Sequence, residues 1–329
     1  MLNFGVIGTN WISKKFISAT QTHHHAQTVA VFSRRQQSGQ AFKADIGIDF
    51  TVYDQLESFL NHPSMNVVYI ASPNHVHFDQ IMMALKANKH VLVEKPAVIS
   101  SQELQQIQDY LREHPQLYFM EAVKQTFFTA FHAVEKALPE IGHIIGANLN
   151  YLAYDENKIQ FAKQEPLPSV LSARAARGVL YDLGVYLVHN ALRWFGEPLD
   201  YHYKASIVDH PDGADYFGVG TLIYDDYQIN FSVGNHTYSE LKSEIYGDHG
   251  TVILEHPTHL EHIKVITDDQ NQQSTSYPKM ANTMMPELDY FINMVQDNQS
   301  QKMWRQMHFT DKAVEILENM RQSAHITFN

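Results

Sequence analysis

Glu94, Lys95 and Pro96 are the residues whose types and position most directly suggest chemistry, and they end a short apolar run at residues 91–93. A short apolar run bounded by polar residues and a proline is typical of a buried parallel strand that reaches its carboxyl end. Ligands of open α/β sheets bind in the crevice just outside such ends. A lysine here is anchored by the sheet and reaches a bound ligand. The alternative is a lysine that is solvated or paired with Glu94.

The beginning of the chain offers a second strand end, of a kind that meets phosphates. Residues 2–7 are a short apolar run, and residues 14–20 are compatible with a helix. A strand, a glycine turn and a helix in this order present free backbone N–H groups and a helix dipole to a phosphate. We therefore expect the turn between them to contact a nucleotide. Its residues are Gly8, Thr9, Asn10, Trp11 and Ile12.

This turn departs from the dinucleotide fingerprint G-x-G-x-x-G/A, in which each small residue has a task. Gly8 holds the first place, Asn10 the second and Ser13 the third. Asparagine tolerates a left-handed backbone, but its side chain narrows the approach to a pyrophosphate. Ser13 is small enough for close packing of the helix. By itself, the motif is weak evidence for a dinucleotide site.

Ser33, Arg34 and Arg35 follow the next apolar run, at residues 29–32. An NAD site usually has an acidic residue near this point, which accepts hydrogen bonds from the ribose 2′-hydroxyl. A hydroxyl and two guanidinium groups match the oxygens of a 2′-phosphate instead. Within a dinucleotide fold the pattern favours NADP(H), with NAD(H) as the alternative. Outside such a fold, the three residues are a solvated basic turn.

These side chains require elements that bring several strand ends together. Apolar runs at residues 50–53 and 67–71 alternate with helical stretches at residues 40–45, 54–60 and 78–87. Alternation at this spacing is typical of βαβ units around a parallel sheet. The carboxyl ends of its strands then line one crevice. After the run at 67–71, this crevice receives Ser72, Pro73, Asn74 and His77.

Strand patterns dominate the second half of the chain. Residues 217–223 and 229–233 alternate apolar with small or polar side chains around a turn. Helical stretches at residues 284–295 and 312–320 close the chain. The two halves meet at a short crossover near Val123. We therefore expect a dinucleotide-binding domain at residues 1–122 and a substrate-binding and oligomerisation domain at residues 123–329.

Length and composition bound the classes of function. A chain of 329 residues exceeds the size at which one core usually stops growing. The net charge of −12 disfavours nucleic acids and anionic membranes as general partners. The absence of cysteine excludes disulfides, thiol nucleophiles and thiolate metal sites. With no membrane-length apolar run and no signal-like leader, we expect a cytoplasmic enzyme or binding protein.

His23, His24 and His25 form a run that suggests a metal site. They lie in a polar stretch before the apolar run at residues 29–32, which favours a solvated surface connection. We therefore expect no metal in this protein.

The motifs together resemble the Gfo/Idh/MocA family of oxidoreductases. GVIGTNWIS, VFSRR, ASPNHVH and HVLVEKP follow the family's order and spacing, and EKP is its most specific short signature. GVLYDLGVYLVH at residues 178–189 is similar to the family's second-domain helix segment, and GDHGT at residues 247–251 to a characteristic hairpin. The resemblance covers nearly the whole chain. It implies an α/β protein, in which an N-terminal Rossmann domain with a parallel sheet precedes a C-terminal α/β domain with a large, mostly antiparallel sheet.

The resemblance also implies an activity, which is hydride transfer between nicotinamide C4 and a carbinol or carbonyl carbon of a sugar-like or dihydrodiol substrate. Lys95 matches the family's catalytic lysine, and Tyr186 the acid/base position, where many relatives have histidine. A free tyrosine has a pKa of about 10, and a nearby ammonium group favours the phenolate. Tyr186 would then exchange the proton while Lys95 polarises the oxygen. Asp182, four residues earlier on the same helical face, would orient the substrate or Lys95.

Each of these residues has a structural alternative. In this alternative, Tyr186 is one of the core residues of an apolar helix. Asp182 then caps a helix or pairs with another side chain for structural reasons. Arg177 and His189 occupy places where the family usually has glycine and Asp or Asn, so each is either a substrate contact or a structural residue. Arg174 and Arg177 also have the option of pairing with surface carboxylates.

Two other functions remain open on the same fold. A non-catalytic NAD(P)-binding regulator is favoured by Asn10, whereas the retention of Lys95 and Tyr186 favours an enzyme. A hydrolase or lyase that uses its cofactor transiently is the third option. We also expect a homodimer, because alternating strands in the second domain leave a sheet face that few helices cover, and a large exposed apolar face seeks a partner.

Overall fold

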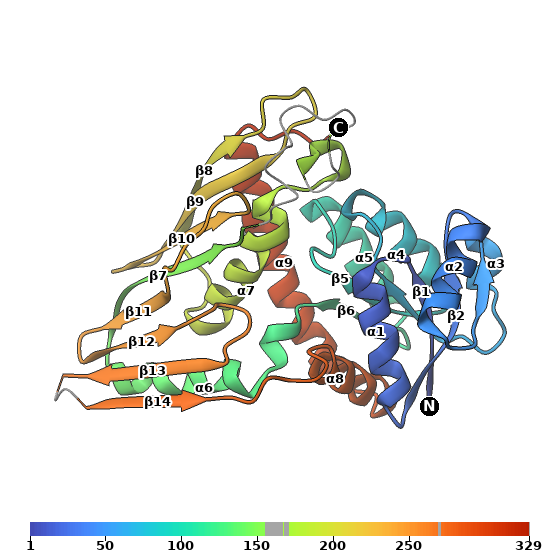
Figure 1. Cartoon of the computed structure of the whole chain (residues 1–329), viewed down its shortest axis with the longest axis horizontal. Helices are drawn as coiled ribbons and strands as arrows, with labels where there is room; N and C mark the ends of the chain where they lie inside the picture. Colours follow the sequence, from blue (N-terminus) through green and yellow to red (C-terminus); the bar gives the residue numbers. More distant parts are fainter. Residues whose placement is uncertain (155–166, 168–170, 269–270, 329) are drawn as a thin grey trace. The chain divides into compact units, whose positions relative to one another are not determined.

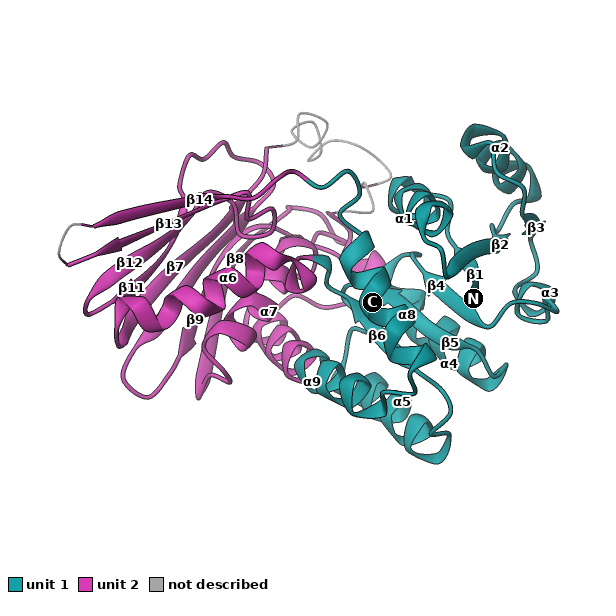
Figure 2. Ribbon diagram, turned by 90° about the horizontal axis from the view of Figure 1, so that it is seen from below, with its two compact units in different colours: residues 1–124, 280–310 teal, residues 125–279, 311–329 magenta. Residues whose placement is uncertain are grey.

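The computed structural model describes residues 1–154, 167, 171–268 and 271–328, and Figure 1 traces their path. The chain forms two compact units, coloured separately in Figure 2. The first is Met1–Lys124 with Met280–Thr310, and the second is Gln125–Lys279 with Asp311–Asn329. The expected division into residues 1–122 and 123–329 differs from this in one respect, because Met280–Thr310 return to the first unit.

The first unit is built on a six-stranded sheet with the strand order β3-β2-β1-β4-β5-β6, in which every pair is parallel. The order reverses between β1 and β4, and this is the place where open α/β sheets bind ligands. The expected Rossmann sheet is confirmed. The strands are β1 (Leu2–Ile7), β2 (Ala26–Phe32), β3 (Thr51–Tyr53), β4 (Val67–Ile70), β5 (His90–Glu94) and β6 (Phe119–Ala122).

The helices of the first unit pack their apolar sides against its sheet, and this packing buries the strands as well. β4 (VVYI) is buried at every position, as expected for a central parallel strand. The Phe16 ring of α1 stacks on Tyr69 at 3.7 Å, and Phe291 of α8 lies 6.4 Å from Phe4, which explains why residues 280–310 join this unit. The helices are α1 (Trp11–Thr22), α2 (Gln36–Ile46), α3 (Leu56–Leu60), α4 (His77–Lys86), α5 (Ser101–Glu113) and α8 (Met285–Gln296).

The second unit contains an eight-stranded sheet with the order β14-β13-β12-β11-β7-β10-β9-β8. Only the β7–β10 pair is parallel in this described sheet, so the expected mostly antiparallel domain is confirmed. Its strands are β7 (Ile144–Leu152), β8 (Asp200–Ile207), β9 (Asp215–Ile223), β10 (Gln228–Gly234), β11 (Ser243–Gly247), β12 (Gly250–Leu254), β13 (His262–Thr267) and β14 (Gln272–Ser276).

Helices of the second unit pack against this sheet, α6 (Thr129–Ala137) at β13 and α7 (Val185–Trp194) at β7. A π-helix, Leu180–Gly184, leads directly into α7. The last helix, α9 (Ser300–Ser323), begins in the first unit and ends in the second. No helix in the described part of the chain is long and apolar enough to cross a membrane.

The two faces of the larger sheet differ in chemistry. Leu149 and Phe231 are buried, whereas their neighbours Asn148, Asn150 and Asn230 are exposed or half-buried on the other face. Together with Glu244 and Tyr246 these amides line a shallow hollow. Phe231 and Leu241 also line this hollow, so polar side chains interrupt the expected apolar face at its centre without replacing it.

Candidate functional site: a cofactor pocket and a tyrosine cluster

The turn between β1 and α1 requires glycine at its first position. Gly8 has a φ of +112°, a conformation that residues with a side chain rarely adopt. A Cβ atom at Gly8 would also lie 2.7 Å from the carbonyl oxygen of Ala71, which follows β4. The turn is therefore held closely against the carboxyl end of β4.

Asn10, in the second place of the fingerprint, is the N-cap of α1. Its Oδ1 accepts hydrogen bonds from the backbone N–H groups of Ile12 and Ser13, both at 3.0 Å, and its Nδ2 donates to the carbonyl oxygen of Ala71 at 2.7 Å. The side chain is thus turned onto the helix end and the neighbouring strand. Two helix N–H groups that a phosphate would otherwise meet are already occupied.

Ser13 is fully buried, as expected from its small size. Its hydroxyl lies 3.2 Å from Asn10 Oδ1, to which it donates. The helix packing that the fingerprint assigns to its third residue is therefore retained, although the first turn of the helix is capped from within.

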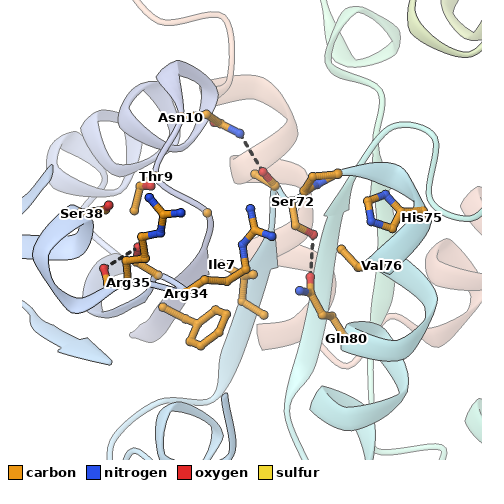
Figure 3. A pocket seen from close by; sticks show the side chains of 15 residues that line it. Ile7, Thr9, Asn10, Arg34, Arg35, Ser38, Ser72, His75, Val76 and Gln80 are labelled. Carbon is orange, nitrogen blue, oxygen red and sulfur yellow. Dashed lines mark hydrogen bonds between the residues drawn. The ribbon is translucent and has the colours of Figure 1, made fainter. Parts of the chain in front are cut away.

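An open cavity of about 650 Å³ lies at the carboxyl ends of β1, β2 and β4. Figure 3 shows the guanidinium groups of Arg34 and Arg35 between the β1–α1 turn and Ser72. No carboxylate occurs among the described residues of its lining, so the pocket suits an anion. The residues are Ile7, Gly8, Thr9, Asn10, Phe32, Ser33, Arg34, Arg35, Ser38, Ala71, Ser72, Pro73, His75, Val76 and Gln80.

Seven of the thirteen residues expected to hold a cofactor line this pocket. The other six lie outside the lining, and they are Trp11, Ile12, Asn74, His77, Glu94 and Lys95. Trp11 and Ile12 lie on the first turn of α1 beyond the lining, and the Trp11 side chain is 71% exposed. Asn74 follows Pro73 in a 3₁₀-helix and is largely buried. The lining also includes Ser38 and Gln80, which the sequence analysis missed.

Gln80 was detectable in principle. It lies one helical turn after Val76, and its Oε1 accepts a hydrogen bond of 2.6 Å from Ser72 Oγ (Figure 3). If the stretch after Ser72 is taken as a helix, Val76 and Gln80 lie four residues apart and therefore on the same side, which faces the pocket.

Lys95 follows the last residue of β5, and buried side chains hold its turn. The Glu94 carboxylate accepts hydrogen bonds from the Tyr69 hydroxyl at 2.6 Å and from the backbone N–H of Lys95. Burial raises the pKa of Glu94, whereas the Tyr69 hydroxyl and the charge of Lys95 lower it. On the far side of the turn, Glu121 accepts a hydrogen bond of 2.9 Å from the backbone N–H of Ala97. The lysine therefore starts from a fixed backbone.

His77, which was expected to contact the cofactor, contacts two backbone carbonyl groups in this structure. Its side chain is 1% exposed and lies outside the pocket lining. Nδ1 is 3.0 Å from the carbonyl oxygen of Pro96, and Nε2 is 2.9 Å from that of Ser72. His77 therefore ties the turn after β4 to the turn after β5.

The second unit gathers a separate cluster of titratable side chains. The rings of Tyr186 and Tyr151 are 6.0 Å apart, and His256 packs edge-on against Tyr151 at 4.9 Å. Burial raises the pKa of Tyr151, and the charge of Asp182 raises it further. We name Tyr151, Asp182, Tyr186 and His256 the tyrosine cluster. No sequence motif marks Tyr151 or His256, which come from β7 and from the loop after β12.

Asp182 belongs to the π-helix Leu180–Gly184 and Tyr186 to α7, so the expectation of one continuous α-helix is wrong here. π-helical turns inside α-helices are frequent at functional sites. Asp182 still acts electrostatically on Tyr151, the ring neighbour of Tyr186, and the three residues therefore belong to one cluster.

The remaining candidates lie in less informative places. His189 is 1% exposed in α7. Arg174 is exposed and pairs with Asp212 at 3.0 Å, whereas the Arg177 side chain is half-buried. His23 pairs with Asp289 at 2.7 Å, and no group of three or more potential metal ligands occurs among the described residues.

Comparisons with known proteins agree with this geometry. Residues 2–122 match the model of an oxidoreductase family with an NAD-binding Rossmann fold, and residues 138–253 match the GFO/IDH/MocA C-terminal domain. The chain is 29% identical over 298 residues to the uncharacterized oxidoreductase YgjR of Escherichia coli, with 91% of this chain and 89% of that protein covered.

A second relative is the NADP(+)-dependent scyllo-inositol 2-dehydrogenase IolU of Bacillus subtilis, which is 26% identical over 328 residues. The match covers 100% of this chain and 98% of IolU. Among solved structures, the 3-ketoreductase KijD10 of Actinomadura kijaniata, in complex with NADP and TDP-benzene, superposes with a TM-score of 0.84. At 18% identity, with 98% of this chain and 97% of KijD10 covered, this likeness shows the shared fold.

Proposed function

The chain belongs to the Gfo/Idh/MocA family of NAD(P)-binding oxidoreductases, and we propose that it is an NADP(H)-dependent dehydrogenase or reductase of a sugar-like or dihydrodiol substrate. The observation that carries the proposal is a pocket lined by two arginines, together with a lysine that follows the neighbouring strand β5 and whose turn is fixed from several sides. The residues present fit a dinucleotide, because Gly8 admits a close approach and the two arginines offer charged donors.

The choice of NADP(H) over NAD(H) rests on Arg34, Arg35 and Ser33, which line the pocket together with no described carboxylate. Guanidinium forks match phosphate oxygens bidentately. An acidic residue that would bind the free 2′-hydroxyl is missing from this strand end. The NADP(+) dependence in the name of IolU points in the same direction.

Arg34→Ala is expected to weaken NADP(H) binding roughly tenfold or more, since a charge-assisted hydrogen bond contributes about 1.5–3 kcal/mol. Binding of NAD(H) should hardly change, because NAD(H) has no 2′-phosphate. Isothermal titration calorimetry with both cofactors measures the difference. Arg174→Ala, which removes an exposed arginine of the second unit, is the matched control. Tighter binding of NAD(H) than of NADP(H) by the wild type would contradict the cofactor assignment.

We assign the chemistry to Lys95, Tyr186 and Asp182. When bound, the nicotinamide accepts or supplies the hydride. Tyr186 takes the proton from the carbinol oxygen during oxidation and returns it during reduction. Lys95 polarises that oxygen, and Asp182 orients the substrate or Lys95. Arg177, half-buried ahead of the π-helix, remains a proposed contact for a polyhydroxylated or anionic substrate. His189 is buried, which favours its structural reading.

A non-catalytic NAD(P)-binding regulator is the second candidate, and one observation favours it. Asn10 occupies the N–H groups of Ile12 and Ser13, so the end of α1 offers a phosphate fewer donors than a glycine-rich turn would. A panel of substrates separates the two functions, because a regulator binds the cofactor without turnover. A hydrolase or lyase that uses the cofactor transiently would instead convert a substrate without net change in the reduced cofactor.

We propose a homodimer that forms through the open face of the larger sheet. The family resemblance points the same way. The polar centre at Asn148, Asn150 and Asn230 requires an interface with many hydrogen bonds rather than an apolar one. Light scattering at micromolar concentration should return twice the mass of the chain, and Asn148→Lys, which places a charge on this face, should shift the mass toward the monomer. A monomer mass for the wild type would count decisively against the dimer.

We place the protein in the cytoplasm, with a small polyol or carbonyl compound as its substrate. The absence of cysteine fits a reducing compartment. The net charge of −12 argues against nucleic acids and membrane surfaces as partners. Cell fractionation that recovers the protein outside the cytoplasm would contradict this location.

A further inference from the structure

Asp215, at the first position of β9, connects the larger sheet to the start of the π-helix. Its side chain is 2% exposed, and its Oδ2 accepts a hydrogen bond of 2.9 Å from the backbone N–H of Leu180. The same oxygen accepts a second hydrogen bond, of 2.6 Å, from the hydroxyl group of Tyr203 in β8. Leu180 is the first residue of the π-helix that carries Asp182 and leads into α7.

Two glycines make room for this pair. Gly178 has a φ of +130°, and a Cβ atom there would lie 1.9 Å from Asp215 Oδ1. A Cβ atom at Gly218 would lie 1.9 Å from the Tyr203 hydroxyl oxygen. The carboxyl group and the phenol therefore occupy space that any other residue at these positions would fill. The chain is shaped to bring Asp215 to the beginning of the π-helix.

A carboxyl group at the position of Asp215 is unfavourable for folding, because it is buried. Burial raises its pKa to about 6, although the hydrogen bonds from Tyr203 and Leu180 lower it, and the charge of Asp182 raises it further. An asparagine would accept the same N–H without a charge to desolvate. Because a buried charge is unfavourable for folding, its presence beside the π-helix points to a task other than stability.

We propose that Asp215 is a positioning residue, whose carboxylate anchors the π-helix and thereby sets Asp182 and Tyr186 for proton exchange with the substrate. The proposal rests on the proposed dehydrogenase function. Asp215 touches neither the substrate nor the cofactor in this scheme and acts through the N–H of Leu180. Among the residues that the structure describes, the titratable groups that face it are Tyr203 from β8 and Tyr181 and Asp182 from the π-helix.

Asp215→Asn is the first test, because an amide oxygen in the place of Oδ2 still accepts both hydrogen bonds but lacks the charge that strengthens them. We expect turnover to fall on the order of 10- to 100-fold, the range that follows from a small displacement of catalytic groups. The KM for the substrate and the affinity for NADPH should change little. Above pH 6 the melting temperature should stay the same or rise, because the variant no longer buries a charge. Asp225→Asn, in the exposed turn after β9, is the control.

Tyr203→Phe is the second test, and we expect it to shift the dependence of kcat on pH. The Tyr203 hydroxyl lowers the pKa of Asp215, so its removal should shift the acid limb of kcat from about pH 6 to a higher pH. A residue with a purely structural role would not displace this limb. Wild-type turnover that is flat through pH 6, or a limb that Tyr203→Phe leaves in place, overturns the proposal.

Hydrogen exchange provides a readout that does not depend on activity. Asp215→Ala should increase exchange in peptides that span residues 178–186, and Asp215→Asn, whose neutral amide anchors Leu180 more weakly, should increase it less. Unchanged exchange in Asp215→Ala overturns the anchoring role even if the wild type turns over no substrate of the panel. Near-normal turnover of Asp215→Asn, with a clear loss in Tyr186→Phe, overturns the positioning role while the proposed function stands. Should Asp215→Ala not fold, the first two variants still decide.

Discussion

Replacing Tyr186 with phenylalanine is expected to lower turnover by about 10²- to 10⁴-fold, the usual contribution of a general acid–base group. The substitution removes one oxygen and keeps the ring, which lies 6.0 Å from the ring of Tyr151. Packing of α7 is therefore preserved, and the melting temperature and NADPH affinity should barely move. Steady-state kinetics on a substrate that the wild type uses well measures the loss.

Tyr151→Phe is the matched control for Tyr186→Phe, since it removes a phenol oxygen from the same tyrosine cluster. Burial and the charge of Asp182 both raise the pKa of Tyr151, which keeps this phenol protonated and makes it the poorer base. Its loss should therefore cost much less. Near-normal turnover in Tyr186→Phe would remove Tyr186 from the mechanism, and His256, beside Tyr151, would be tested next.

Lys95→Met is expected to be at least as damaging as Tyr186→Phe. In the proposed mechanism, this substitution removes the charge that polarises the substrate oxygen and favours the phenolate, while the side chain keeps a similar length. The backbone of the turn is held by Glu94, His77 and Glu121 and should stay in place. Kinetics on Lys95→Met, with the exposed Lys86→Met of α4 as the control, measures the effect.

The double variant Lys95→Met with Tyr186→Phe tests whether the two residues act as a unit. When two residues act together, removing both lowers turnover little more than removing one of them. The combined loss in turnover should therefore fall well short of the product of the single losses. Full multiplication of the two effects would show that Lys95 and Tyr186 contribute independently.

The parallel sheet could be predicted because local patterns specify its strands. β1 (Leu2–Ile7) has the bounds expected from its apolar run. The return of Met280–Thr310 to the first unit could not be predicted, since periodicity reports that a helix is amphipathic and not which sheet it covers. α9 was likewise expected over residues 312–320 only, because its first turns are mostly polar.

The candidate site was predictable where short motifs encode backbone geometry, as at Gly8 and at the turn after β5. It was not predictable where tertiary contacts decide. A π-helix and an α-helix differ by one residue in each hydrogen-bonded turn, so the pattern around Asp182 could not separate them. Nothing in the sequence pattern distinguishes Asp215 from other residues at the start of a strand. Only the folded sheet brings its carboxyl group to the backbone N–H of Leu180.

The central claim is that this chain moves hydride between NADP(H) and a carbinol or carbonyl carbon. The most direct measurement is the absorbance of the reduced cofactor while the wild type is offered NADP+ with aldoses, deoxysugars, inositols and trans-dihydrodiols. We expect formation of NADPH with at least one of these polyols, and its loss in Lys95→Met and Tyr186→Phe. Tight binding of NADP(H) without oxidation of any polyol or reduction of any matching carbonyl compound would contradict the claim and favour the regulator.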